Sequence, residues 1–222
     1  MIPYLCLLLI VCLLANIKIK IKKKALFIDF IIGSILVFFS GFRSENVGTD
    51  TGSYLYYYKN GTKYTSFTDV LLSDTSTEMG YKILEYISQL LSENQYFILI
   101  LSSLVFVFFS VYSINKLSDN YLVSIFTYLC FGVFLFSFNG IRQALALSIF
   151  MIAFKHIINK STLKYVLIVL LASLFHKSVL ICLPFYFILN KEFSTKFFII
   201  LLIIGSFLSY FIRPLIELTS VI

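Results

Sequence analysis

The sequence predicts an all-α protein, a polytopic bundle of about seven or eight helices that each cross a membrane. Of its 222 residues, 59% are hydrophobic and only 13% are charged, whereas soluble chains are roughly half apolar and about a quarter charged. The apolar residues lie in runs, most of them close to the ~20 residues that a bilayer-spanning helix needs. Lysines cluster between these runs, where membrane proteins carry the residues that decide orientation.

The apolar runs are the expected helices, because backbone groups in lipid must find their hydrogen-bond partners within the same segment. The runs cover residues 2–17, 25–42, 96–114, 121–138, 141–158, 163–175, 178–190 and 197–212. The polar stretch 43–95 separates the second run from the third, and we expect it to be one long outer loop that carries short helices. We therefore predict a single transmembrane domain over residues 1–222.

The basic residues predict an orientation in which the N-terminus lies outside. Most lysines then fall on the cytoplasmic side, beginning with the cluster from Lys18 to Lys24, as the positive-inside rule requires. The arginines Arg43, Arg142 and Arg213 fall on the outer side. Arginine binds phosphate bidentately, so outer arginines favour an anionic ligand held at the outer face. Contact with lipid headgroups is the alternative.

The segment Asn139-Gly140-Ile141-Arg142-Gln143 joins the fourth run to the fifth. Asn139 is a favourable N-cap for the following helix, and Gly140 lets a ligand approach the backbone closely. Arg142 and Gln143 then occupy the first helical turn, where free N–H groups and the helix dipole favour anions. The segment therefore predicts a pyrophosphate or carboxylate site, with a capped helix and an interfacial arginine as the alternative.

The two shortest apolar runs predict a helical hairpin over residues 162–190. Each run is well short of a full span. Lysines lie before the first run and after the second, so both of these ends are expected in the cytoplasm. The chain then goes towards the outer face and returns, with His176 and Lys177 at the tip. Histidine can be a general acid or base near neutral pH, and an ionisable residue at membrane depth is usually functional. The alternative is a hydrogen-bonded histidine in an interfacial turn.

The outer segment 43–95 begins with a cluster of aromatic and acidic residues. Asp50, Tyr54 and Tyr58 are spaced to share one face of a helix. Carboxylates with aromatic rings are common in sugar sites, but tyrosine is also enriched at membrane interfaces. Both interpretations stay open.

Further along this segment, an apolar stripe with helical spacing predicts an amphipathic helix on the outer membrane surface. The stripe consists of Ile83, Leu84, Ile87, Leu90 and Leu91, with Lys82, Glu85 and Gln89 on the opposite face. Glu78 precedes it and is a candidate second carboxylate.

Several function classes are excluded by the sequence. There is no P-loop, GxGxxG, HExxH or GxSxG motif, each of which marks a soluble-enzyme site. The four cysteines lie inside apolar runs without CxxC spacing, so we expect no metal and no cofactor. The formal charge of +7 comes from lysines clustered between the runs, which argues against nucleic acid as a partner.

Four pieces of the sequence, taken in order, carry a resemblance to a known family. They are Gly48-Thr49-Asp50 with Tyr54, Glu78-Met79-Gly80-Tyr81, Phe138-Asn139-Gly140-Ile141-Arg142-Gln143, and Phe175-His176-Lys177-Ser178 with Pro184. Together they resemble the EpsG family of bacterial exopolysaccharide proteins, which are Wzy-like polymerases. The resemblance implies a GT-C-like membrane fold in the bacterial cytoplasmic membrane. It also implies a glycosyltransferase-type enzyme that joins undecaprenyl-pyrophosphate-linked oligosaccharides into exopolysaccharide, capsule or O-antigen at the outer face.

The resemblance also implies roles for individual residues. Arg142, with Arg43 nearby, would hold the departing pyrophosphate, and His176 or Asp50 would take the proton from the attacking sugar hydroxyl. The implied substrate-binding residues are Arg43, Tyr54, Glu78, Asn139, Gln143 and Lys177. The implied partners are the lipid-linked oligosaccharide, membrane lipids, a flippase and a chain-length regulator, and no metal or cofactor is needed because the donor is already activated.

Three other functions compete with a polymerase. A flippase or transporter for lipid-linked saccharides would also use outer arginines, but would place ionisable residues along the membrane midplane. A non-catalytic membrane subunit of a polysaccharide synthase complex is the second, and a membrane acyltransferase is the third. Relatives usually continue with further spans after the His-containing region, so we expect this chain to be a truncated member of the family.

Overall fold

The computed structural model describes residues 2–21 and 25–219, and these are entirely helical apart from turns and loops. The helices are α1 (Ile2–Lys20), α2 (Ala25–Gly41), α3 (Thr51–Asn60), α4 (Phe67–Leu72), α5 (Met79–Leu91), α6 (Phe97–Leu117), α7 (Tyr121–Cys130), α8 (Val133–Phe136), α9 (Ile141–Phe150), α10 (Ala153–Ile158), α11 (Thr162–Ser173), the 3-10 helix η2 (Lys177–Cys182), α12 (Phe185–Leu189) and α13 (Thr195–Thr219). The predicted all-α class is confirmed.

Within the described residues, three helical segments are long and apolar enough to cross a membrane: α1, α6 and the α9–α10 pair over Ile141–Ile158. Shorter apolar helices lie at α2, α7, α11, Lys177–Leu189 and Thr195–Leu208. These segments identify an integral membrane protein. The number of spans, the GT-C-like architecture and the outer position of the N-terminus stay predictions.

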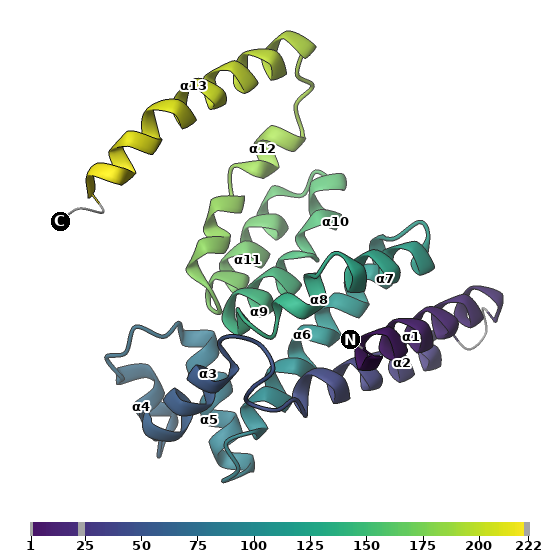
Figure 1. The fold of residues 1–222 in the computed structure, drawn as a ribbon, viewed down its shortest axis with the longest axis vertical. Coiled ribbons are helices and arrows are strands. Elements are labelled where there is room, and N and C mark those ends of the chain that lie inside the picture. Colours follow the sequence, from purple (N-terminus) through teal and green to yellow (C-terminus); the bar gives the residue numbers. More distant parts are fainter. Residues whose placement is uncertain (1, 22–24, 220–222) are drawn as a thin grey trace. The chain divides into compact units, whose positions relative to one another are not determined.

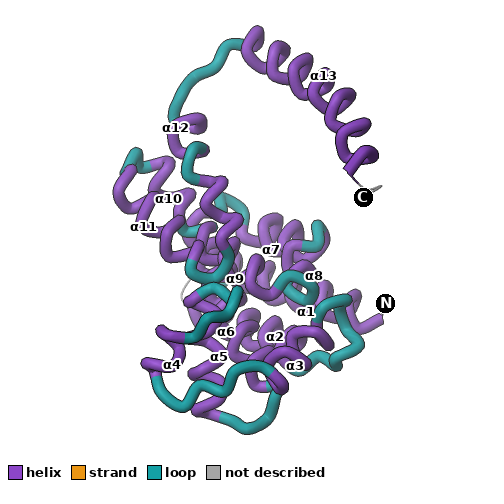
Figure 2. Tube along the Cα trace, turned by 90° about the vertical axis from the view of Figure 1, so that its left-hand side faces the viewer, coloured by secondary structure: helices purple, strands orange, loops and turns teal. Residues whose placement is uncertain are grey.

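The chain divides into two compact units, Met1–Tyr186 and Phe187–Ile222. In the first unit, α6 packs against α2, α5, α7 and α9, while α11 packs against α9, α10 and η2. Figures 1 and 2 show α3, α4 and α5 gathered at one end of this unit and α10 and α11 at the other. The second unit consists mainly of α13, and Arg213 belongs to the stretch whose side chains lie outside the described residues.

The predicted span 121–138 is broken rather than continuous. The backbone turns at Gly132, whose positive φ of 78° suits glycine because a Cβ is unfavourable there, and α8 is only one turn long. Phe134 on α8 is fully buried and packs edge-on against Phe138 and beside Tyr128. Sequence hydropathy does not register such a break, because the residues on both sides of it are equally apolar.

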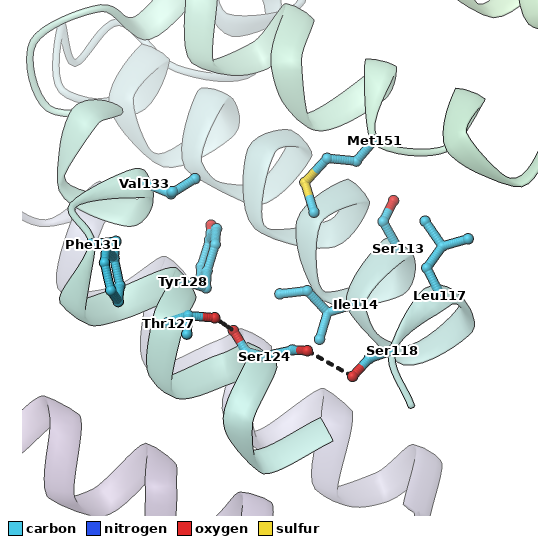
Figure 3. Close-up of a pocket in the computed structure, with 10 residues that line it drawn as sticks. All are labelled: Ser113, Ile114, Leu117, Ser118, Ser124, Thr127, Tyr128, Phe131, Val133 and Met151. Atoms are coloured by element: carbon cyan, nitrogen blue, oxygen red, sulfur yellow. Dashed lines mark hydrogen bonds between the residues drawn. The ribbon is translucent and has the colours of Figure 1, made fainter. Parts of the chain in front are cut away.

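The break adjoins a mainly apolar pocket of about 340 Å³, lined by residues of α6, α7 and α8 that include several hydroxyl-bearing side chains. Figure 3 shows Ser118 and Ser124 hydrogen-bonded across it, with hydroxyl oxygens 2.7 Å apart, and Met151 on the far wall. Phe131 and Val133, on either side of Gly132, are 80% and 47% exposed, so the break lies at the surface of the first unit.

The outer segment forms α3, α4 and α5, as expected for a loop carrying short helices. The predicted amphipathic helix exists as α5. On its apolar stripe Leu84 is buried, whereas Ile87 and Leu90 are exposed, and its place on the membrane surface stays a prediction. Lys82, expected on the polar face, is buried because its ammonium donates to the carbonyl of Ser73 at 2.7 Å.

Lys18 was expected in the first cytoplasmic connection, and the structure corrects this. It lies in the last turn of α1, where its Nζ is 2.5 Å from Asp29 Oδ1 on α2 and 2.8 Å from Asn115 Oδ1 on α6. It also lies 3.4 Å above the ring of Tyr121 on α7. A charge pair tolerates burial when it is well paired and hydrogen-bonded. The rest of the cluster, Lys22 to Lys24, is outside the described residues.

We predict that Lys18→Met destabilises the protein by about 3–5 kcal/mol, because the buried Asp29 carboxylate loses its counter-charge. The thermal unfolding midpoint of the purified protein in detergent measures this loss. The double variant Lys18→Met/Asp29→Leu removes both charges and should recover most of the stability. A single variant as stable as the parent protein would contradict the prediction.

Candidate functional site

The Glu78 carboxylate lies at the centre of a cluster formed by three distant segments. Its Oε2 is 2.6 Å from Nη1 of Arg142, and its Oε1 is 3.1 Å from Nδ1 of His176. The backbone N–H of Lys177 also reaches Oε1, at 3.4 Å. The Glu78 side chain is only 8% exposed, whereas Arg142 and His176 are 32% and 29% exposed. A buried carboxylate therefore supports two side chains that remain accessible.

Glu78 is held in place by the close approach of α5 to the end of α11. The N–H of Gly80 donates to the carbonyl of Leu174 at 2.6 Å. A Cβ on residue 80 would lie 2.7 Å from that carbonyl oxygen, so only glycine permits this contact. The contact brings the N-terminus of α5 to the turn that carries His176.

The charge state of Glu78 follows from its neighbours. Burial raises the pKa of its carboxyl, but the hydrogen bond from its own backbone N–H, the charge of Arg142, the N–H of Lys177 and His176 together outweigh burial and lower it. The carboxylate is therefore ionised near neutral pH and can only accept hydrogen bonds. Nδ1 of His176 must then carry the proton, which leaves Nε2 as the nitrogen that can act as a base.

Arg142 occupies the first turn of α9, as expected, but Asn139 is not the N-cap. The cap is Gly140, and it makes no side-chain cap hydrogen bond. Asn139 Oδ1 instead accepts the N–H of Thr49 at 2.8 Å, because the loop before α3 docks on this segment. Gly48 allows the docking, since a Cβ there would lie 2.6 Å from the carbonyl oxygen of Phe138.

Arg43 lies at the start of the same loop and is only 7% exposed. Its Nε donates to Thr51 Oγ1 at 3.1 Å, its Nη1 donates to the carbonyl of Ser40 at 2.5 Å, and its guanidinium covers the ring of Phe138. Burial lowers its pKa to about 10, so it stays charged at neutral pH. These contacts fasten the loop to α2, and substrate binding by Arg43 stays a prediction.

The remaining predicted site residues surround the cluster at different depths. Asp50 is exposed and precedes α3, where the hydroxyl of Thr49 lies 3.1 Å from its Oδ1. Tyr54 is half-buried, packs edge-on against Tyr81 and interacts with the charge of Arg142. Gln143 is half-buried beside Arg142, and the side chain of Lys177 is exposed. The structure thus brings Glu78, Arg142 and His176 into direct contact and leaves Asp50 on the docked loop.

Glu85 is a titratable group that sequence reasoning placed on the polar face of its helix. It is half-buried on α5, and burial raises its pKa to about 7, against the opposing charges of Arg142, Lys63 and Lys82. One signal in the sequence was its position one turn after the buried Tyr81, which puts both on the same face.

Comparison with known proteins gives one positive finding. The EpsG family model matches residues 26–222, a span that contains Glu78, Arg142 and His176. No curated protein and no solved structure matches the chain.

We predict that Gly80→Ala destabilises the protein by about 1–3 kcal/mol, because the added Cβ would overlap the Leu174 carbonyl. Gly33→Ala is the matched control, since a Cβ there meets only Val107 Cγ1 at 3.9 Å. Thermal unfolding midpoints of the two variants in detergent should separate them. Equal midpoints would show that α5 can approach α11 without a glycine.

We also predict a pH effect from Glu85. Its pKa is about 7 in the folded protein, above the ordinary value of 4.5, so between these pH values the folded state binds more protons than the unfolded state. Its contribution to stability therefore falls as pH rises through this window. Glu85→Gln should remove this part of the pH dependence of the unfolding midpoint, and an unchanged slope would refute the assignment.

Proposed function

Because the chain belongs to the EpsG family, we propose that it polymerises lipid-linked oligosaccharide repeat units into an exopolysaccharide at the outer face of the cytoplasmic membrane. The proposal rests on one observation above all. A buried, ionised Glu78 holds an arginine and a histidine on its two carboxylate oxygens, at 2.6 and 3.1 Å. A guanidinium that could bind an anion and an imidazole that could act as a base therefore contact the same carboxylate, and this contact supports the proposal.

Arg142 is suited to bind the pyrophosphate of the glycan donor. Its guanidinium interacts with Glu78 and Tyr54, and its exposed part would contact phosphate oxygens, for which the planar fork of arginine is suited. The first turn of α9 adds free backbone N–H groups and the positive end of a helix dipole. As the bond between the anomeric carbon and the pyrophosphate breaks, these groups would stabilise the negative charge that develops on the leaving group.

His176 is suited to act as the base. A hydroxyl of the incoming repeat attacks the anomeric carbon of the donor glycan, and its proton passes to Nε2 of His176. Glu78 accepts the Nδ1–H bond, which fixes the tautomer and orients the ring, and it stabilises the imidazolium that forms, in the manner of the carboxylate in a catalytic triad. The products are the extended glycan on the acceptor lipid and the released lipid pyrophosphate.

The neighbouring residues would define the rest of the substrate site. Tyr54 would supply an aromatic ring for sugar contact, and Asp50 and Lys177, both exposed, would supply charges. Asn139 holds the loop that carries Asp50 through its bond to Thr49, so it would act by positioning. Arg43 would act in the same way, through its bonds to Ser40 and Thr51.

We predict that His176→Ala and Arg142→Ala each abolish long polymer while the protein stays in the membrane. Loss of a general base slows a reaction by about 10²–10⁴-fold. Glycan chain-length ladders from cells carrying each variant measure the effect, together with the location of lipid-linked intermediates. Single repeats should accumulate on the outer leaflet.

His156→Ala is the matched control, because His156 is the second of only two histidines and lies on α10. It should give a normal ladder. Normal ladders from both site variants would sink the assignment of the site. Repeats trapped on the inner leaflet would instead indicate a flippase.

A further inference from the structure

A groove of about 720 Å³ lies between α2 and α6, apart from the Glu78 cluster. Its polar end is marked by Asp29 and Asn115, and its other end by Phe38 and Phe42. The stretch of α2 between Asp29 and Phe42 is roughly 20 Å long at the rise of an α-helix. The groove therefore has the length and shape of an extended chain rather than of a compact ligand.

The groove exists because α2 carries small residues where it faces α6. The two helices approach closely at Gly41, where a Cβ would lie 3.0 Å from Ile100 Cα. At Gly33 a Cβ would meet only Val107 Cγ1, at 3.9 Å. The space is therefore wider at Gly33 than at Gly41, and aromatic side chains line it. Phe30, Phe38 and Phe108 are 72%, 67% and 60% exposed there.

The chemistry of the groove selects a hydrocarbon chain. Its walls are aliphatic and aromatic, and both helices are membrane segments, so a hydrocarbon chain is the ligand that such walls favour. The aromatic rings offer flat apolar faces to the methyl groups and double bonds of a branched, unsaturated chain. The class of lipid follows from what lies beside the Phe42 end of the groove.

The groove ends at Phe42, one residue before Arg43. Arg43 begins the loop that docks on Asn139 through Thr49, and it lines a small cavity together with Ile141, the first residue of α9. A lipid whose tail fills the groove would therefore present its headgroup where the Arg142 segment begins.

We propose that the α2–α6 groove binds the polyisoprenoid tail of the lipid-linked saccharide and thereby delivers its pyrophosphate to the N-terminus of α9. The proposal deepens the proposed function, on which the identity of the lipid rests. It gives α2 and α6 a role in binding the lipid, separate from the chemistry at Glu78, Arg142 and His176.

The chain has no tryptophan, so a single introduced tryptophan reports on one position. Phe108→Trp places it among the residues that line the groove, and Leu9→Trp places the control on α1, where Leu9 is 63% exposed. Each protein is placed in nanodiscs whose phospholipid acyl chains carry bromine, which quenches tryptophan. Titration with undecaprenyl phosphate should restore fluorescence at position 108 and leave position 9 quenched.

Gly33→Leu and Ser34→Leu, each added to Phe108→Trp, place a larger side chain at a residue that lines the groove. Both should abolish the recovery. Equal responses at positions 108 and 9 would overturn the proposal. An equal recovery with hexadecyl phosphate would also overturn it, by showing that the groove accepts any lipid chain.

The titration needs no turnover, so it is separable from the polymerase test. If fluorescence recovers at position 108 and His176→Ala gives a normal ladder, the groove binds the tail and the assigned polymerase site is wrong. If fluorescence does not recover and His176→Ala loses polymer, the polymerase site is supported and tail binding by the groove is wrong.

Discussion

The Glu78 carboxylate connects the start of α5 to two accessible basic side chains, Arg142 on α9 and His176 after α11. It is nearly buried, and a carboxylate taken out of water is tolerated only when charged and hydrogen-bonding partners replace the water. Arg142, His176 and the N–H of Lys177 are those partners. Loss of any one leaves a buried charge less well paired, so the start of α9 and the turn after α11 both depend on α5 being in place.

Two glycines allow the close backbone contacts that hold segment 43–95 against the parts of the chain that carry Arg142 and His176. Gly80 lets α5 touch the carbonyl of Leu174, and Gly48 lets the loop before α3 touch the carbonyl of Phe138. One contact lies two residues before His176 and the other four residues before Arg142. The outer segment is therefore a structural part of the site, and its short helices position residues that belong to the membrane helices.

The parts of this structure that were predictable from the sequence are those set by local chemistry. Run lengths identified the apolar helices, and the ends of those runs singled out Arg142 and His176 as exposed basic groups. The role of Glu78 was not predictable in this way, because its partners lie 64 and 98 residues away and no spacing rule links them. The break at Gly132 was not predicted for a different reason, because hydropathy depends on composition and carries no information on a backbone angle. Lys18 was misplaced because a terminal lysine is usually solvated, and only the fold reveals that Asp29 faces it.

The Lys18–Asp29 pair has a consequence for how the chain enters the bilayer. A lone charged residue costs about 2.5–3.5 kcal/mol to insert at the centre of a membrane helix. Here the two charges lie 11 residues apart on consecutive helices, so they can neutralise each other as soon as α1 and α2 have been synthesised. Asn115 and Tyr121 belong to helices that emerge much later. The two charges inside this helix pair can thus be matched before the rest of the bundle exists, while Lys20 and Lys22 to Lys24 add further positive charges in the sequence between them.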